Sequence, residues 1–327
     1  MKAATWIVFL WAASALAQVS GFRPLSQPEV SKLLTKAKGG NRQSQLRLGM
    51  AYEYGLGVQS DPKTAEYWLN TAAGFGDPEA QTQLGLLYLQ PEFADSRQAL
   101  RWFMRAAAAG FARAEHNIGL MYTLGMGVPV DRNEAIRWYR RAVQHGLAPS
   151  RTNLGVLLVE SSDKAAQAEG FQGLSNAARN GDSDAENALA YCYQQGKGTT
   201  PDLAKAMDLY GRAAAHGNLT AMKNLAAMYQ NGLGVPKNPA EAFRWYEEAC
   251  NAGEWRACGS VANAYLLGNG TTRNQAKAYQ FALMAGVEHS YIQELEKQLS
   301  ESERNRAADE AERWKQVHAV RLSALPH

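Results

Sequence analysis

Three cysteines are the residues whose type and spacing point most directly to chemistry. Cys250 ends one amphipathic segment, and Cys258 lies near the start of the next, across the turn formed by residues 251–257. In an exported chain, a pair placed in this way predicts a disulfide that ties adjacent helices together. Cys192 falls in an apolar column when the repeats described below are aligned. We therefore expect it to be a buried thiol, and a reactive thiol is the alternative.

The six histidines do not predict a metal or catalytic centre. No two of them have His-x-x-x-His spacing, and no cluster of other ligand residues lies near them. His145 and His216 each precede a glycine that closes a helix, where the helix dipole favours a cation. Gly55 and Gly57 follow a helix, and no P-loop lysine comes after them, so they predict a turn. We expect no metal and no cofactor.

The start of the chain has the pattern of a secretory signal peptide. Met1-Lys2 is basic, residues 4–16 form an apolar run, and Ala15-Leu16-Ala17 is a small-residue cleavage site. We expect cleavage after Ala17 and a periplasmic mature protein; a buried N-terminal helix is the alternative. Gln18 stands where a bacterial lipoprotein would have cysteine, so we expect no lipid anchor. No second long apolar run follows, which argues against a membrane span.

An internal repeat organises the rest of the chain. A leucine-like position recurs at intervals of 34 to 36 residues, at Leu48, Leu84, Ile118, Leu154, Leu189, Leu225 and Val261. A tyrosine usually follows four residues later, and a glycine closes each unit. One helix pair of this size cannot bury its own apolar face, so the pairs must stack on one another. The period predicts an all-α fold, a right-handed α-solenoid of about seven helix-pair repeats.

The repeat divides the chain into four parts. Residues 1–17 are the signal peptide, 18–43 an N-terminal capping segment, 44–286 the solenoid, and 287–327 the C-terminal capping helices and tail. In the last part, Ser300 and Glu303 form a capping box. The helix that it begins carries the apolar positions Ala307, Ala311, Trp314 and Val317.

The repeated pattern Leu-Gly-x-x-Tyr, Gly-x-Gly-Val, Ala-x-x-Trp-Tyr and Ala-Ala-x-x-Gly resembles the Sel1-like repeats, which are relatives of the tetratricopeptide repeats. Repeat 2 departs from it, with residues 90–93 in place of the glycine turn. Repeat 4 also departs, with Gly173 where the tryptophan belongs. The Cys-x7-Cys pair is similar to that of the cysteine-rich subgroup, which implies the same bridge.

Some cysteine-rich Sel1-like proteins are described as binding β-lactams, and the chain has two Ser-x-x-Lys motifs, which begin at Ser60 and Ser161. Both motifs fall in loops between helices. Neither of the partner motifs of penicillin-recognising enzymes, Ser-Asp-Asn and Lys-Thr-Gly, occurs in the sequence. We therefore expect no enzyme, and weak β-lactam binding or β-lactamase-like activity is an alternative.

Tetratricopeptide-like solenoids bind partners on a concave face lined by the first helix of each pair. Counted from the leucine column, the residues expected on this face are Tyr54, Leu86, Leu89, His116, Leu120, Leu124, Val156, Glu160, Tyr191, Gln194, Gln195, Lys223, Gln230 and Asn263. This face is apolar in repeats 2 to 4 and rich in amides in repeats 5 to 7. The alternative for each leucine is that it packs against the neighbouring repeat.

The leading functional hypothesis is a periplasmic solenoid that binds another protein. The chain has no basic stripe with interleaved aromatic residues, which argues against nucleic acid as the partner. Exported Sel1-like proteins include immunity proteins that neutralise antibacterial phospholipase effectors of type VI secretion, so the resemblance implies a secreted toxic effector as the partner. The alternative is a scaffold of an envelope complex for exopolysaccharide export or signalling.

Overall fold

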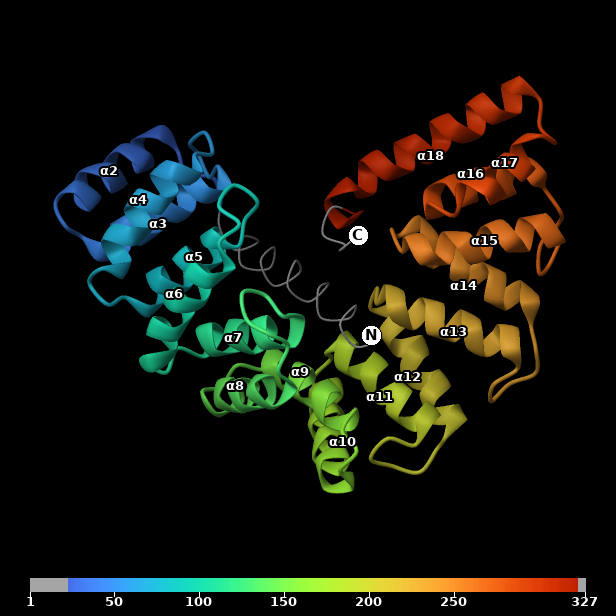
Figure 1. Cartoon of the computed structure of the whole chain (residues 1–327), viewed down its shortest axis with the longest axis horizontal. Coiled ribbons are helices and arrows are strands. Elements are labelled where there is room, and N and C mark those ends of the chain that lie inside the picture. Colours follow the sequence, from blue (N-terminus) through green and yellow to red (C-terminus); the bar gives the residue numbers. More distant parts are fainter. Residues whose placement is uncertain (1–22, 323–327) are drawn as a thin grey trace. The chain divides into compact units, whose positions relative to one another are not determined.

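The structure is a computed structural model of the 327-residue chain, and it describes residues 23–322. Within this range the fold is all-α, with 17 helices and no strand (Figure 1). The helices are α2 (Gln27–Lys38), α3 (Arg42–Tyr54), α4 (Pro62–Ala73), α5 (Pro78–Tyr88), α6 (Ser96–Ala108), α7 (Ala112–Leu124), α8 (Arg132–Gln144), α9 (Pro149–Val159), α10 (Lys164–Arg179), α11 (Ser183–Gln195), α12 (Leu203–Ala215), α13 (Leu219–Asn231), α14 (Pro239–Asn251), α15 (Trp255–Leu267), α16 (Gln275–Ala285), α17 (His289–Glu296) and α18 (Glu301–Leu322). The predicted signal peptide lies outside the described residues.

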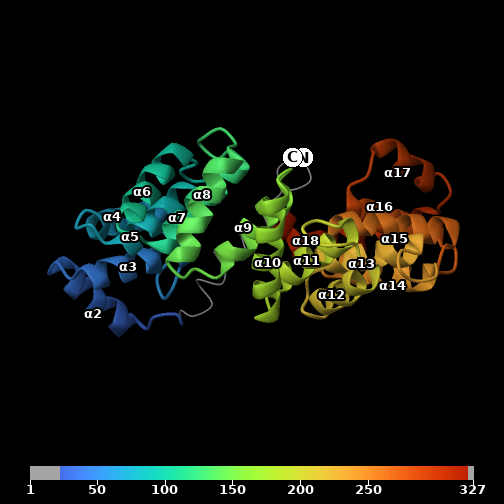
Figure 2. The same ribbon diagram turned by 90° about the horizontal axis from the view of Figure 1, so that it is seen from below.

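The chain divides into two compact units, with the boundary after Leu157. Unit 1 holds α2 to α8 and most of α9, and unit 2 holds the end of α9 and the helices up to α18. From α3 to α8 in unit 1 and from α10 to α16 in unit 2, each helix packs against the next, so that the first helix of a repeat contacts the second and the second contacts the first helix of the following repeat. In unit 2, α11, α13 and α15 lie in one layer and α12 and α14 in another (Figure 2). The predicted stack of helix pairs is confirmed.

The local sequence signals explain how each pair forms, as in the pair α13–α14. Asn218 caps α13 by accepting a hydrogen bond from the backbone N–H of Ala221. Gly232 ends that helix with a φ of 70°, a conformation that a side chain would strain. Asn238 then caps α14, and Pro239 occupies its first turn. Cap, glycine and proline therefore set where both helices begin and end.

The glycine after the leucine of the motif has a packing role. A Cβ atom at Gly119 would lie 2.7 Å from Cε1 of Tyr139, which is fully buried on the second helix of the same repeat. Gly85 meets the Phe103 ring in the same way, at 2.5 Å. The missing side chain lets the two helices of a pair approach closely enough to bury a large ring between them.

The predicted thiol chemistry is confirmed. Cys250 and Cys258 form a disulfide with an S–S distance of 2.03 Å, which joins the end of α14 to α15. Cys192 is free and fully buried. Burial raises the pKa of its thiol to about 12, so it is protonated and unreactive at neutral pH.

The C-terminal helix α18 packs against α16. The Ser300–Glu303 capping box is present, with the Ser300 backbone N–H donating to Oε2 of Glu303 at 2.9 Å. Trp314 is buried, and its Nε1 donates to the carbonyl oxygen of Cys250 at 3.0 Å. The prediction that Val317 lies on the apolar face of this helix was wrong, because its side chain is 77% exposed. Within residues 23–322, no helix combines the length and the apolar character needed to cross a bilayer.

Candidate partner-binding surface

In unit 1, the predicted binding residues divide by burial. Tyr54, Leu89, Leu124 and Val156 are half-buried and reach the surface. Leu86, His116 and Leu120 are at most 6% exposed, so they do not offer the open surface that we expected. The low exposure of Leu86 and Leu120 favours the alternative that they pack against the neighbouring repeat, over the prediction that they anchor a partner.

These residues are buried because their helices, α5 and α7, are enclosed within unit 1. All nine residues from Ala80 to Tyr88 are buried, so α5 has no free face along most of its length. Leu86 belongs to the same buried apolar cluster as Leu84 and Leu87 on that helix. A helix that is buried on every side in this way cannot present a stripe of side chains to a partner.

His116 has a structural role in this enclosed region. Its Nδ1 lies 2.9 Å from Oγ of Ser150, and its ring packs beside that of Tyr139. Burial lowers the pKa of His116 to about 4, so the ring is neutral at physiological pH. His116 therefore links α7 to α9 without carrying charge.

In unit 2, the predicted residues are more accessible. Tyr191, Gln194 and Lys223 are half-buried, as is Glu160 at the start of the unit. Tyr191 donates a hydrogen bond to the Glu160 carboxylate; burial raises the pKa of the tyrosine, and the nearby negative charge raises it further. Gln195, Gln230 and Asn263 are exposed.

Two of these amides are oriented by tyrosines that the sequence analysis did not assign to the site. The hydroxyl of Tyr210 donates to Oε1 of Gln194 at 2.9 Å. One repeat later, the hydroxyl of Tyr246 donates to Oε1 of Gln230 at 3.0 Å. In both cases the tyrosine comes from the second helix and the glutamine from the first. Because its oxygen is engaged, each glutamine keeps its NH₂ group as the donor for a partner.

Gln230 and Asn263 line one cavity of about 360 Å³ between α13, α14 and α15. Tyr246 and Phe243 contribute aromatic rings to its wall, and Leu267, which is 73% exposed, lies at its edge. The hydroxyl of Tyr291 also donates to Oδ1 of Asn263 at 3.0 Å. The cavity thus combines oriented amides with apolar surface, the combination that protein-binding sites use.

In repeat 1, the position that corresponds to these glutamines is a buried glutamate, Glu53, with no tyrosine at the matching position of the second helix to orient it. Glu53 occupies the place that Gln194 and Gln230 occupy in their repeats, but Leu69 stands where those repeats have tyrosine. The carboxyl group accepts a hydrogen bond from Gln90 Nε2 at 2.8 Å and a second one from the hydroxyl of Tyr54. Burial raises the pKa of Glu53 to about 8, and the neighbouring Gln90 and Tyr54 oppose this shift only in part.

Two buried glutamates explain the histidines that precede closing glycines. Glu115 is fully buried and pairs with Arg141 at 2.8 Å and with Nδ1 of His145 at 2.7 Å. In repeat 5, Glu186 makes the same contacts with Arg212 and His216. We missed these clusters, although the sequence contains the signal: a glutamate three residues before the leucine column occurs only in the two repeats that have these histidines.

The serines of the two Ser-x-x-Lys motifs make backbone contacts. The hydroxyl of Ser60 donates to the carbonyl oxygen of Glu53 at 3.2 Å. The hydroxyl of Ser161 accepts a hydrogen bond from the backbone N–H of Asp163 at 3.1 Å, in the turn that starts α10. Both contacts are those of turn residues.

Comparison with known proteins agrees with the repeat pattern. A family model described as Sel1 repeat matches residues 42–74, 78–111, 112–147, 183–218, 219–254 and 255–286. The chain belongs to the Sel1 repeat family. The segment 148–182, which holds the departing repeat 4, lies outside the matched Sel1 repeats.

A solved structure supports the same assignment. A Sel1 repeat protein from Oxalobacter formigenes is 35% identical, with a TM-score of 0.56; the match covers 65% of this chain and 89% of that protein. A protective antigen of uropathogenic Escherichia coli with an SLR fold is 21% identical, with a TM-score of 0.41; this match covers 91% of this chain and 82% of the antigen. No protein with a curated description matches the chain significantly. Sel1 repeats mediate protein–protein interaction.

Proposed function

We propose that this Sel1 repeat protein is an exported, non-enzymatic solenoid that binds another protein through the first helices of its repeats. The proposal is supported by the family, by the signal-peptide pattern before Gln18, and by the surface of unit 2. In unit 1, only the half-buried residues, such as Tyr54 and Leu89, remain candidates for contact with the partner.

The observation that carries the proposal is the pair of tyrosine-oriented glutamines. Gln194 and Gln230 lie on successive first helices, and each is held by a buried tyrosine. A long side chain that is already fixed loses less conformational entropy when a partner binds, so its hydrogen bonds contribute more to affinity. Tyr191 precedes Gln194 by three residues on α11 and adds the kind of aromatic surface that dominates interface energy.

The most concrete form of the proposal is an immunity-type inhibitor of a secreted antibacterial phospholipase effector. It combines the expected periplasmic location with the family resemblance. A scaffold of an envelope complex would use the same surface, so the two forms differ in the partner and not in the site.

Affinity capture with matched variants tests the binding surface. The chain is used as bait in a periplasmic extract, beside the double variants Gln194→Ala/Gln230→Ala and Asp208→Ala/Glu248→Ala. The control positions are exposed on α12 and α14, the second helices of the same repeats. We expect one protein to bind the parent chain and the control but not the first variant. Equal capture by all three would contradict the proposed surface.

The identified partner then separates the two forms. An inhibitor predicts that the partner is toxic when directed to the periplasm alone, and that co-expression of this chain restores growth. A partner that is harmless there and belongs to an envelope complex would overturn the inhibitor form and leave the binding function in place.

A further inference from the structure

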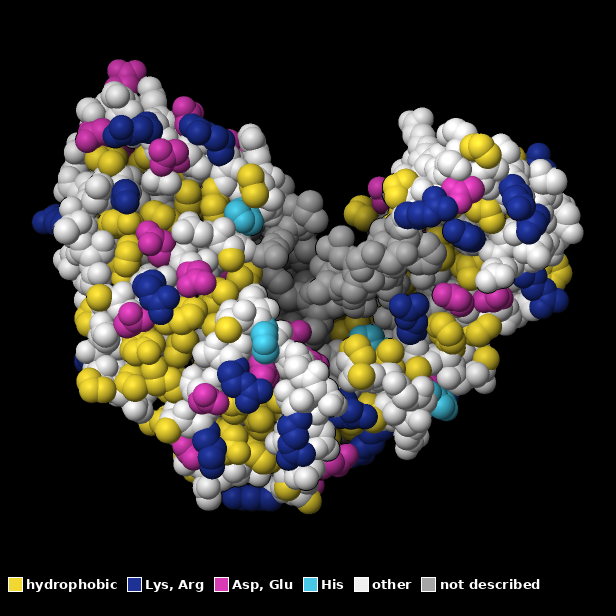
Figure 3. All heavy atoms as spheres, turned by 180° about the vertical axis from the view of Figure 1, so that it is seen from behind, with side chains coloured by type: hydrophobic (Ala, Val, Ile, Leu, Met, Phe, Trp, Pro, Cys, Tyr) yellow, Lys and Arg dark blue, Asp and Glu magenta, His cyan; other side chains and the backbone are white. Residues whose placement is uncertain are grey.

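The positive charge of the chain is concentrated near its N-terminal cap. Residues 23–47 contain six Lys and Arg residues and one acidic residue, which gives a charge of +5. The whole chain has a formal charge of +3, so all the other residues together carry −2. In Figure 3, Lys and Arg side chains gather on the lobe that carries α2 and α3. Such a strong local concentration attracts anions.

This charge surrounds a cavity of about 390 Å³ between α2 and α3. Lys32 and Lys36 line it from α2, where they lie one helical turn apart, and Arg47 lines it from α3. Leu25 and Leu33 provide apolar surface. Three cations therefore line one cavity from two helices.

Among residues 23–322, no carboxylate forms an ion pair with Lys32, Lys36 or Arg47. Glu29 is the one carboxylate among the described residues that lines the cavity, and it is bound by Arg23 and by Ser26. The Arg23 guanidinium and the Ser26 donors hold the pKa of Glu29 at about 2, so it stays ionised but is already engaged.

The start of α3 adds to the positive potential. Asn41, the cap of α3, lines the cavity together with Gln43 and Ser44 of the first turn. The N-terminal end of a helix carries a partial positive charge and favours an anion. This end faces the same cavity as the three cations, so both contributions act on one ligand.

We propose that this cavity binds a phosphate group. A carboxylate carries one charge, whereas a phosphate monoester carries nearly two and offers three acceptor oxygens. The lysines can act as point charges, and the Arg47 guanidinium can engage two oxygens at once. The ligand is either a free phosphorylated molecule or the headgroup of an anionic phospholipid. The site lies on the cap and is separate from the proposed protein-binding residues.

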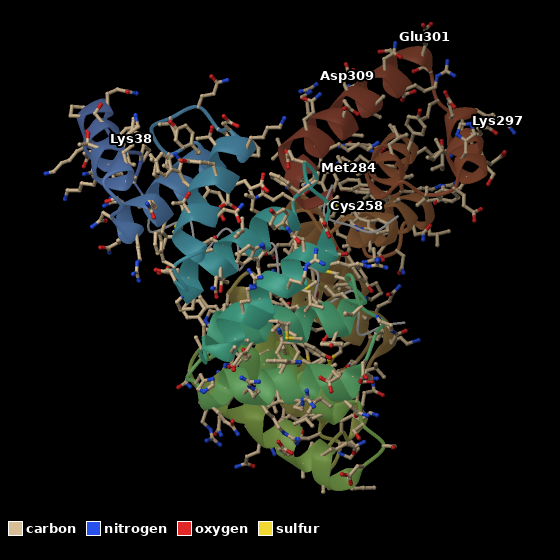
Figure 4. All side chains as sticks on the ribbon, turned by 60° about the vertical axis from the view of Figure 1, so that its left-hand side comes forward. Lys38, Cys258, Met284, Lys297, Glu301 and Asp309 are labelled. Atoms are coloured by element: carbon tan, nitrogen blue, oxygen red, sulfur yellow. A yellow bond between two sulfur atoms is a disulfide. The ribbon has the colours of Figure 1, made fainter. Side chains whose placement is uncertain are left out.

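The test measures binding of inorganic phosphate by isothermal titration calorimetry at constant ionic strength, with acetate as the comparison anion. The purified chain is compared with Lys32→Gln/Lys36→Gln and with Lys38→Gln. Lys38, the last residue of α2, is exposed but does not line the cavity (Figure 4). The parent chain and the Lys38 variant are expected to bind phosphate equally. The double variant should bind at least about tenfold more weakly, because it loses two charge-assisted hydrogen bonds. Circular dichroism checks that each variant is folded.

Vesicle sedimentation distinguishes the two sources of phosphate. Binding to phosphatidylglycerol vesicles but not to phosphatidylcholine vesicles, lost in the double variant, would identify the lipid headgroup. Phosphate binding without vesicle binding would identify a free phosphorylated ligand. The proposal is overturned if phosphate does not bind, if acetate binds as well as phosphate, or if the Lys38 variant loses as much affinity as the double variant.

Discussion

Replacing Glu53 with Gln should stabilise the protein above neutral pH. The side chain is 7% exposed, and burial raises its pKa from the ordinary 4.5 to about 8. In the unfolded chain the same group is ionised above pH 4.5, so folding takes up a proton between pH 4.5 and pH 8. A group whose folded pKa is raised in this way favours the folded state at low pH. That contribution is lost as the pH rises towards 8.

The size of the effect follows from the shift. Each pH unit in this window lowers the free energy of unfolding by up to about 1.4 kcal/mol, which amounts to at most about 5 kcal/mol by pH 8. Glutamine keeps the shape and the acceptor oxygen for Gln90 but cannot ionise. Allowing for local opening that admits water, we expect Glu53→Gln to gain roughly 1 to 3 kcal/mol at pH 8 and little at pH 5.

Urea denaturation at a series of pH values measures this difference. The midpoint of the parent chain should fall between pH 5 and pH 8 relative to that of Glu53→Gln. Glu79→Gln, an exposed change on α5, serves as the control and should follow the parent chain. If the urea midpoints of the parent and of Glu53→Gln changed with pH in the same way, the reasoning would be refuted, because Glu53 would then ionise normally in the folded state.

Two further predictions concern stability. In urea denaturation, Arg141→Ala should lower the free energy of unfolding by roughly 2 kcal/mol or more, because it leaves the buried Glu115 without its guanidinium partner. The control Arg137→Ala removes only an exposed ion pair on the same helix and should lower it by less than about 1 kcal/mol. Cys258→Ser should lower the free energy of unfolding by about 2 kcal/mol, because it removes the disulfide. Hydrogen exchange should show faster opening of α14, α15 and α18, since Trp314 of α18 donates a hydrogen bond to the carbonyl oxygen of Cys250. Uniform destabilisation of both units would contradict this prediction.

The fold could be predicted because each repeat carries its own local signals. The leucine column, the glycine turns and the caps depend on residues within one helix pair, and they recur in phase. The disulfide could be predicted for the same reason, since Cys250 and Cys258 lie across a single short turn. Val317 was misassigned because the helical period continues along α18 whether or not another helix lies beside it.

The candidate site was harder to predict. Whether Leu86 or Leu120 faces a partner depends on how neighbouring helices cross, and the period of a single helix does not contain that information. The roles of Tyr210 and Tyr246 were hidden because their rings occupy a core column, and the sequence does not show that their hydroxyls donate to glutamines of the first helix. These tyrosines show how a core position can orient a surface group.

Site-specific photocrosslinking tests the central claim most directly. A photoreactive amino acid replaces Gln230 on the first helix of repeat 6 or, in the matched control, the exposed Glu248 on the second helix of the same repeat. Each variant is produced in its native host and illuminated in intact cells. Our account predicts that position 230 crosslinks to one discrete protein and that position 248 does not. Crosslinking of that protein through position 248 but not through position 230 would contradict binding by the first helices.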